Sequence, residues 1–251
     1  MSSWIRSKSL PAKHKVTPVT VYHDTSSSTN VISMYMDVLA SYIYNQKLGE
    51  FCTVWDPIAV LTASLKSNPQ VKLLKVKPEE PATPTTIYVS TVSSMKLVDI
   101  QKYASTLFQY TSSFTTSINH ILEKASIKST FDMGIHLSET NLATYVDLIK
   151  AYQLKSKKTT MAIYVMADSY STVTAFQKLG SPSWAVVSLS KTPNTNSQFL
   201  QTMAEVQIMS VLPALILDFS NDVDRFIYVM RPNKTQLDYF REVNGTPWHL
   251  L

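Results

Sequence analysis

The second half of the chain alternates between two kinds of segment, and this alternation constrains the fold more than any other feature. Short runs of apolar and β-branched residues are typical of buried strands, and longer runs with apolar residues every three or four positions are typical of amphipathic helices. The pattern predicts strands at residues 130–137, 159–168, 183–190 and 214–220, and helices at 141–155, 169–180, 196–212 and 222–232, before a C-terminal tail. Strands that alternate with helices favour a mostly parallel sheet covered on both faces.

The first half begins in the same order. Residues 19–24 and 50–56 are predicted strands on either side of a helix at 31–49, which together form a βαβ unit. Further segments are a strand at 71–76, a Pro- and Lys-rich loop, a short strand at 86–91, and one or two helices within 95–125. We therefore predict an α/β protein with two Rossmann-like lobes and mostly parallel sheets.

The pattern stops near residues 126–130 and then restarts, which predicts a boundary there. We expect an extended basic arm at residues 1–18, an N-terminal α/β lobe at 19–128 and a C-terminal α/β lobe at 129–251. A chain of 251 residues suits two lobes of about 125 residues each, or one large domain. Its hydrophobic content of 45% is enough for a substantial core, so global disorder is not expected.

The sequence lacks the residues that several kinds of site and targeting segment require. Cys52 is the only cysteine, which excludes an intrachain disulfide and a CxxC zinc site and favours a reducing compartment. The longest apolar run, residues 211–217, is far shorter than the ~20 residues that span a bilayer. The basic N-terminus lacks the apolar core of a signal peptide. We expect no metal, no membrane span, and a location in the cytoplasm or within a protein assembly.

The formal net charge of +5 is concentrated in two places. Basic residues gather in the arm (Arg6, Lys8, Lys13 and Lys15) and in the sequence LKSKK (Lys155, Lys157 and Lys158). They form either a solvated surface or a contact for an anionic partner. Nucleic-acid binding has little support, because no aromatic platform or known motif accompanies the charge.

Three motifs of the second half occur in an order that is informative about function. Gly134 and His136 lie in MGIHLSE, and Tyr164, Ala167 and Asp168 lie in AIYVMADS. Phe219, Ser220, Val223 and Arg225 lie in LDFSNDVDRF. Over residues 130–231 this order resembles the donor-binding lobe of GT-B-fold fucosyltransferases, in particular the α1,6-fucosyltransferase and nodulation fucosyltransferase group.

The resemblance implies an inverting, metal-independent glycosyltransferase that needs no cofactor. Its substrates would be a nucleotide sugar, such as GDP-fucose, and a glycan acceptor. The candidate donor-binding residues are Gly134, His136, Asp168, Ser220, Asn221 and Arg225. Which residues would be catalytic is unknown.

Each candidate also has a structural interpretation. His136 either hydrogen-bonds a phosphate or sugar hydroxyl or is a structural histidine satisfied by backbone groups. Asp168 binds a ligand or caps the next helix. Ser220 and Asn221 either receive an anion at a helix start or serve as caps. Arg225 either reaches a phosphate or pairs with Asp222, Asp224 or Glu242.

The sequence also departs from the family pattern. Ser138 and Glu139 stand where the family has two arginines, which would hold the donor diphosphate and stabilise the leaving group. Pro213 and Ser169 replace two aspartates, and TSSSTN at 25–30 replaces a glycine-rich loop. These differences predict that sugar transfer is weak or lost.

A second interpretation is a non-catalytic scaffold within a larger assembly that reuses the glycosyltransferase fold. The basic arm, with Trp4 and Ile5 as apolar anchors, would contact a protein partner.

Overall fold

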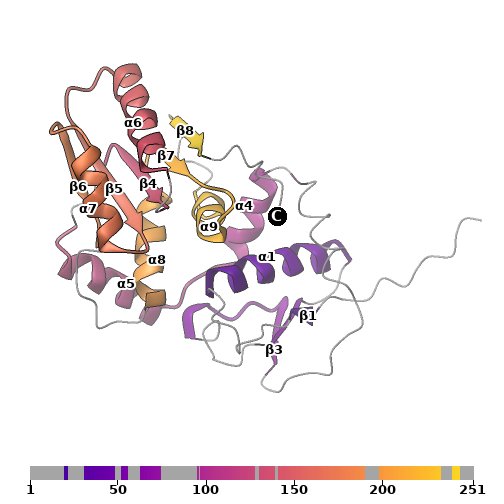
Figure 1. The fold of residues 1–251 in the computed structure, drawn as a ribbon. Coiled ribbons are helices and arrows are strands. Elements are labelled where there is room, and N and C mark those ends of the chain that lie inside the picture. Colours follow the sequence, from indigo (N-terminus) through magenta and orange to yellow (C-terminus); the bar gives the residue numbers. More distant parts are fainter. Residues whose placement is uncertain are drawn as a thin grey trace, which may run out of the picture.

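The computed structural model describes residues 20–21, 31–48, 52–55, 63–74, 95, 97–127, 130–138, 141–189, 198–232 and 239–243. The expected arm at 1–18 and the expected strand at 86–91 lie outside these residues. Two separate parallel sheets, both flanked by helices, make this an α/β fold and confirm the predicted class (Figure 1).

The larger sheet is built by the second half of the chain. Its strands are β4 (Met133–Leu137), β5 (Met161–Ala167), β6 (Trp184–Val187), β7 (Ala214–Leu217) and β8 (Tyr239–Glu242). They are hydrogen-bonded in the order β6-β5-β4-β7-β8, and every neighbouring pair is parallel. The sequence predicted four of these strands. Strand β8 lies in the region interpreted as a tail, because its sequence YFRE is short and half charged.

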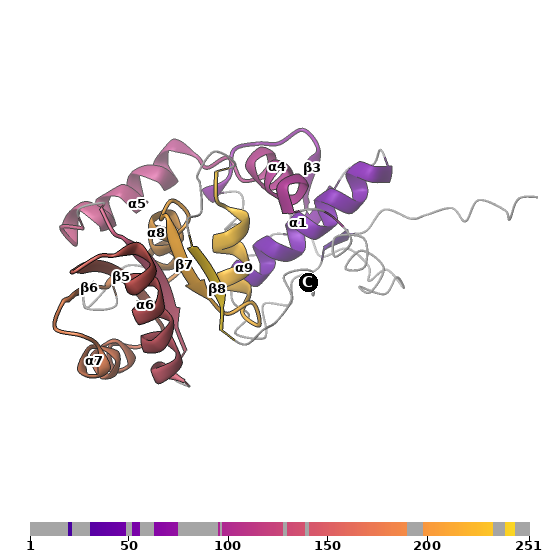
Figure 2. The ribbon, with the colours of Figure 1, turned by 90° about the horizontal axis from the view of Figure 1, so that it is seen from above.

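Helices cover both faces of this sheet, as Figure 2 shows. They are α6 (Leu142–Ser156), α7 (Tyr170–Leu179), α8 (Gln198–Met209) and α9 (Asp222–Val229). Successive side chains of a strand point to opposite faces. Accordingly Met133, Ile135 and Leu137 of β4 pack with α6 and α7, whereas the residues between them face α8 and α9. Because of this alternation, the side chain of His136 points toward α8 and α9.

The smaller sheet has the order β1-β2-β3 and is also parallel. Its strands are β1 (Thr20–Val21), β2 (Cys52–Trp55) and β3 (Val71–Leu74), and α1 (Val31–Leu48) connects the first two. The helical region at 95–125 contains α4 (Leu97–Leu107) and α5 (Ser112–Lys124). Thr111 separates them, because its side chain accepts a hydrogen bond from the Phe114 amide and caps α5.

Helix α1 packs into the same hydrophobic core as α8 and α9. The buried ring of Tyr35 contacts Phe108, Phe199 and Phe226, which come from three other parts of the chain. Ser33 donates a hydrogen bond of 2.6 Å from Oγ to Asp222 Oδ2 at the start of α9. One continuous core therefore joins the first helix to the larger sheet. No helix among the described residues is long and apolar enough to cross a bilayer.

Candidate functional site

The candidate residues come together at the carboxyl edge of the larger sheet. Strands β5, β4 and β7 are adjacent and parallel, so their carboxyl ends meet at one edge. Asp168 follows β5, Ser138 follows β4, and the loop of residues 218–221 follows β7. In α/β folds this edge is where ligands are usually bound. The topology thus places the sequence-predicted residues on one side of the lobe, apart from Gly134 in the middle of β4.

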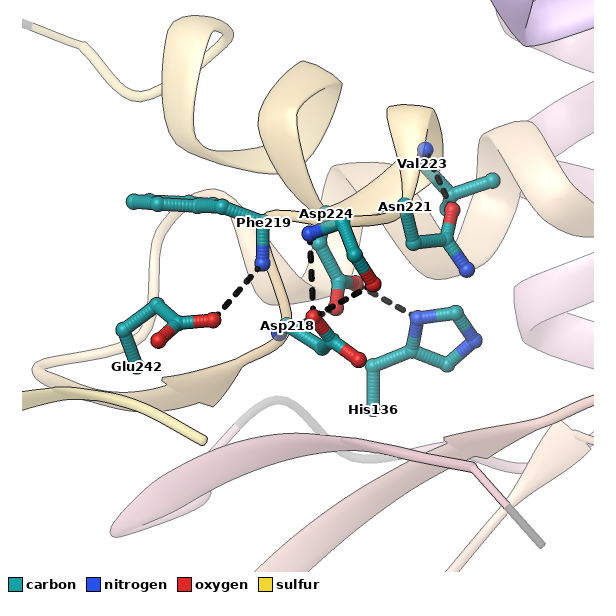
Figure 3. Close-up of polar contacts among 8 residues, drawn as sticks. His136, Asp218, Phe219, Asn221, Val223, Asp224 and Glu242 are labelled. Carbon is teal, nitrogen blue, oxygen red and sulfur yellow. Dashed lines mark hydrogen bonds and ion pairs between the residues drawn. The ribbon is translucent and has the colours of Figure 1, made fainter. Parts of the chain in front are cut away.

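His136 forms a buried ion pair with Asp224 of α9, shown in Figure 3. Its Nδ1 lies 2.5 Å from Asp224 Oδ1, and both side chains are almost completely buried. The other oxygen of the same carboxylate, Oδ2, accepts a hydrogen bond of 2.6 Å from the Asp218 amide. Neither sequence interpretation of His136 named this partner. The contact fixes the imidazole from the end of β4 against the first turn of α9.

The surroundings of His136 favour its charged form. Burial by itself would lower the pKa of His136, but the nearby carboxylates of Asp224, Asp168 and Glu205 raise it to about 9. Burial also raises the pKa of Asp224, although His136 opposes that change. We conclude that the imidazole is protonated at neutral pH and donates a hydrogen bond from Nδ1 to Oδ1 of Asp224.

Glu205 is a second buried acid on the same face of the sheet. It belongs to α8, is 4% exposed, and accepts a hydrogen bond of 3.3 Å from the Tyr164 hydroxyl of β5. Burial raises the pKa of Glu205 to about 8, although His136 lowers it. Glu205 is therefore predominantly protonated at pH 7. Sequence reasoning missed it, although a lone glutamate among the apolar residues of TMAEVQIM was a visible signal.

The loop after β7 satisfies its own backbone donors. Asp218 Oδ1 accepts hydrogen bonds from the amide and the hydroxyl of Ser220, at 2.9 and 2.7 Å. Glu242 Oε1 accepts from the Phe219 amide at 3.2 Å. Asn221 is the N-cap of α9, and its side chain accepts from the Val223 amide at 2.8 Å. Figure 3 shows these acceptors around the loop. The capping interpretation of Asn221 is confirmed.

Arg225 is also engaged within the chain. Its Nη1 lies 3.1 Å from Asp222 Oδ1, in an ion pair between residues three positions apart on α9. Oδ2 of the same aspartate accepts the hydroxyl of Ser33 from α1. Asp222 thus holds the guanidinium on one side and the first turn of α1 on the other. This is one of the pairings that the sequence left open.

The carboxyl edge is therefore acidic and internally bonded. Asp168, Asp218, Asp222, Asp224 and Glu242 contribute carboxylates, while His136, Arg225 and Arg241 are the cations of these segments. The amides of residues 218–220 and 223 already donate to oxygen atoms of the chain, as do Nδ1 of His136 and Nη1 of Arg225. A diphosphate here must displace them and approach several like charges, which costs free energy.

The structure refines two of the candidates. Ser169, not Asp168, caps α7 by accepting a hydrogen bond from the Thr172 amide, so the capping role expected for Asp168 is wrong by one residue. Gly134 packs closely under α8, where an added Cβ would lie 2.5 Å from Met209 Sδ and 2.8 Å from Leu212 Cδ1. The absence of a side chain at Gly134 thus allows the end of α8 to approach β4. Glu139 lies outside the described residues.

Solved structures provide the comparison for this arrangement. The fucosyltransferase NodZ from Bradyrhizobium superposes with a TM-score of 0.54 at 11% identity, over 83% of this chain and 90% of NodZ. The chain has the fold of GT-B fucosyltransferases. A NodZ α1,6-fucosyltransferase co-crystallised with GDP gives a TM-score of 0.52 at 10% identity, over 78% and 87% of the two chains.

At this identity the similarity extends to the fold alone. No model of a known protein family matches the sequence, and no curated protein matches it significantly. The fold predicted from the three motifs is thereby confirmed. The roles of the candidate residues in binding remain predictions. Within the described part of the chain, no group of three or more His, Cys, Asp or Glu side chains is placed to hold a metal ion.

Proposed function

We propose that this chain is a glycosyltransferase-like protein that binds a nucleotide sugar of the GDP-fucose type and in which sugar transfer is weak or lost. The observation that carries this proposal is the set of hydrogen bonds and ion pairs within the chain at the carboxyl edge of the larger sheet. His136, Asp168 and residues 218–225 lie at or beside the carboxyl edge of the larger sheet, where α/β folds usually bind ligands. The donor groups of His136, Asp218 and Ser220 are bonded to carboxylates of the chain.

Donor binding is supported by the fold and by groups that remain at the edge. A GT-B fucosyltransferase of similar fold was crystallised with GDP. Asp168 is exposed beside the end of β5 and can accept hydrogen bonds from sugar or ribose hydroxyls. Nε of Arg225 is buried and has no hydrogen-bond partner among the described residues, so this guanidinium keeps one donor for a ligand. Because the surrounding carboxylates repel the negatively charged diphosphate, we expect its binding to be weak.

The expected loss of sugar transfer follows from the lack of an available positive charge among the candidate residues at the carboxyl edge. The developing negative charge on a leaving diphosphate must be stabilised by positioned donors or cations. Ser138 follows β4 at a position where the family resemblance implies arginine, and it brings no charge. His136 is turned to Asp224 and Arg225 to Asp222, so the charge of each is already neutralised. These cations cannot stabilise a leaving group without first breaking a buried or half-buried pair.

The same internal bonding favours a second candidate, a non-catalytic scaffold. An edge whose amides and cations are satisfied by the chain needs no ligand to be stable. In this alternative the fold is retained for its shape and surfaces, as part of a protein assembly.

Calorimetric titration with GDP, GDP-fucose and other nucleotide sugars distinguishes the two candidates. We expect micromolar or weaker binding of a guanosine nucleotide, and we expect the variant Arg225→Gln to weaken it. Lys178→Gln, which removes an exposed lysine near the end of α7 at the opposite edge of the sheet, serves as the control and should leave the affinity unchanged. If no nucleotide of the panel binds at millimolar concentration, the scaffold function replaces the proposed one.

A further inference from the structure

Two leucines are exposed at the amino edge of the larger sheet, opposite the candidate site. Leu154 near the end of α6 is 82% exposed, and Leu179 at the end of α7 is 53% exposed. Single exposed apolar side chains are common on protein surfaces. The position of this pair is informative because each leucine lies in the last turn of its helix, and both helices run antiparallel to the strands and reach the same edge (Figure 1).

Hydrogen bonds hold these two helix ends together. Gln153, the neighbour of Leu154, accepts a hydrogen bond of 2.8 Å from Nε1 of Trp184, just after the turn that follows α7. Gln153 also donates to Ser183 in that turn, and the Met161 amide donates to the Ser183 carbonyl at 3.1 Å. The turns that precede β5 and β6 are thus directly connected. Leu154 is next to Gln153, and Leu179 is four residues before Ser183, so both leucines lie close to these connected turns at the amino edge.

Lysines accompany both leucines. Lys157 follows α6 in a left-handed conformation with φ of 56° and is exposed, and Lys178 is exposed beside Leu179. Lys158 of the same turn is paired with Asp132, while Lys155 lies over the ring of Tyr239. We call Leu154, Lys157, Lys178 and Leu179 the amino-edge surface. Its lysines belong in part to the LKSKK sequence, which the candidate site does not use.

The larger sheet thus has charges of opposite sign at its two edges. Helices α6 and α7 end in lysines at the amino edge, whereas the carboxyl edge carries the aspartates of the candidate site. The amino edge is complementary to an anionic surface. A polyanion alone would not require exposed leucines, and lysine is depleted in protein–protein interfaces. Lysines that flank exposed apolar side chains match the surface of an anionic bilayer.

We propose that the amino-edge surface docks on an anionic lipid bilayer. Leu154 and Leu179 enter the headgroup region, and Lys157 and Lys178 contact lipid phosphates and carboxylates. In this orientation the carboxyl edge faces away from the bilayer and stays open to the aqueous phase. The inference depends on the surface alone and holds whether or not the chain binds a nucleotide sugar.

Sedimentation of the full chain with vesicles tests the proposal. We expect at least ~tenfold stronger binding to vesicles of phosphatidylcholine with 30% phosphatidylserine than to phosphatidylcholine alone. The double variant Leu154→Ser/Leu179→Ser should lose ~tenfold or more of this binding. Lys157→Gln/Lys178→Gln should lose ~25-fold, at ~fivefold for each lysine, and high salt should reproduce that loss in the wild type.

The matched control is Val98→Ser/Lys102→Gln, an exposed apolar and basic pair on α4. It should bind vesicles like the wild type. All substituted side chains are exposed, so circular dichroism should show unchanged folding. Equal binding to both vesicle types, or equal losses in the control and the amino-edge variants, would overturn the proposal. Binding to RNA or to an acidic peptide without binding to vesicles would overturn it in favour of those partners.

Discussion

Raising the pH from 6.5 to 9 should lower the free energy of unfolding by roughly 5 kcal/mol. The cause is the pair of buried groups whose pKa values are raised in the folded state, His136 to about 9 and Glu205 to about 8. Both groups bind a proton more tightly in the folded chain than in the unfolded chain. A group of this kind stabilises the fold at low pH and loses that contribution as the pH rises.

The two groups act over different ranges of pH. The contribution of His136 is complete below its unfolded pKa of 6.5 and is lost as the pH rises through 9, which amounts to about 3 kcal/mol. The contribution of Glu205 is complete below 4.5 and is lost by about pH 8, so about 2 kcal/mol of it falls between pH 6.5 and 8. Urea unfolding at a series of pH values measures the sum. A free energy of unfolding that is constant or rises over this range contradicts the assignment.

The variant Glu205→Gln separates the two contributions. Glutamine keeps an oxygen for the Tyr164 hydroxyl but does not titrate. We expect a weaker pH dependence between 6.5 and 8, and the slope between 8 and 9 should remain. Glu123→Gln, an exposed change on α5, is the control and should follow the wild-type curve.

The substitution His136→Ala should destabilise the folded chain by about 3–5 kcal/mol at pH 6.5. It leaves the carboxylate of Asp224 buried with a backbone amide as its remaining partner and removes its counter-ion. Urea unfolding of the purified variant gives the value directly.

A double-mutant cycle tests whether the pair is the cause. Asp224→Ala alone should also be strongly destabilising, because it strands a buried imidazolium. His136→Ala combined with Asp224→Ala should cost clearly less than the sum of the two single changes, with a coupling of about 2 kcal/mol or more. If the two effects add, His136 and Asp224 do not depend on each other.

The order of strands and helices could be predicted from the sequence because the spacing of the apolar residues indicates each element. The strand pattern of residues 130–137 and the helical spacing of 141–155 correspond to β4 and α6 within a few residues. Parallel topology then brings the loop after β7 next to the end of β4, which in turn neighbours the end of β5. Strand β8 was missed because four residues with two charges have no alternation long enough to detect.

The bonding within the site could not be predicted from the sequence. His136 and Asp224 are 88 positions apart, and no local pattern indicates that they meet. The three-residue spacing of Asp222 and Arg225 did suggest a pair, because such residues are neighbours on a helix. Whether the Ser220 hydroxyl serves a ligand or a neighbouring carboxylate depends on the path of the loop, which only the structure gives.

Sugar transfer itself is the most direct test of the central claim, that the cations and amides of the carboxyl edge are committed to the chain's own carboxylates. Transfer and hydrolysis of GDP-fucose should be measured side by side with the NodZ α1,6-fucosyltransferase, with glycan acceptors for both proteins. We predict rates ~100–1000-fold below those of NodZ, which corresponds to the loss of one positioned charge-stabilising donor. Rates comparable to those of NodZ would contradict the account and would require another arginine or lysine of the chain to stabilise the leaving diphosphate.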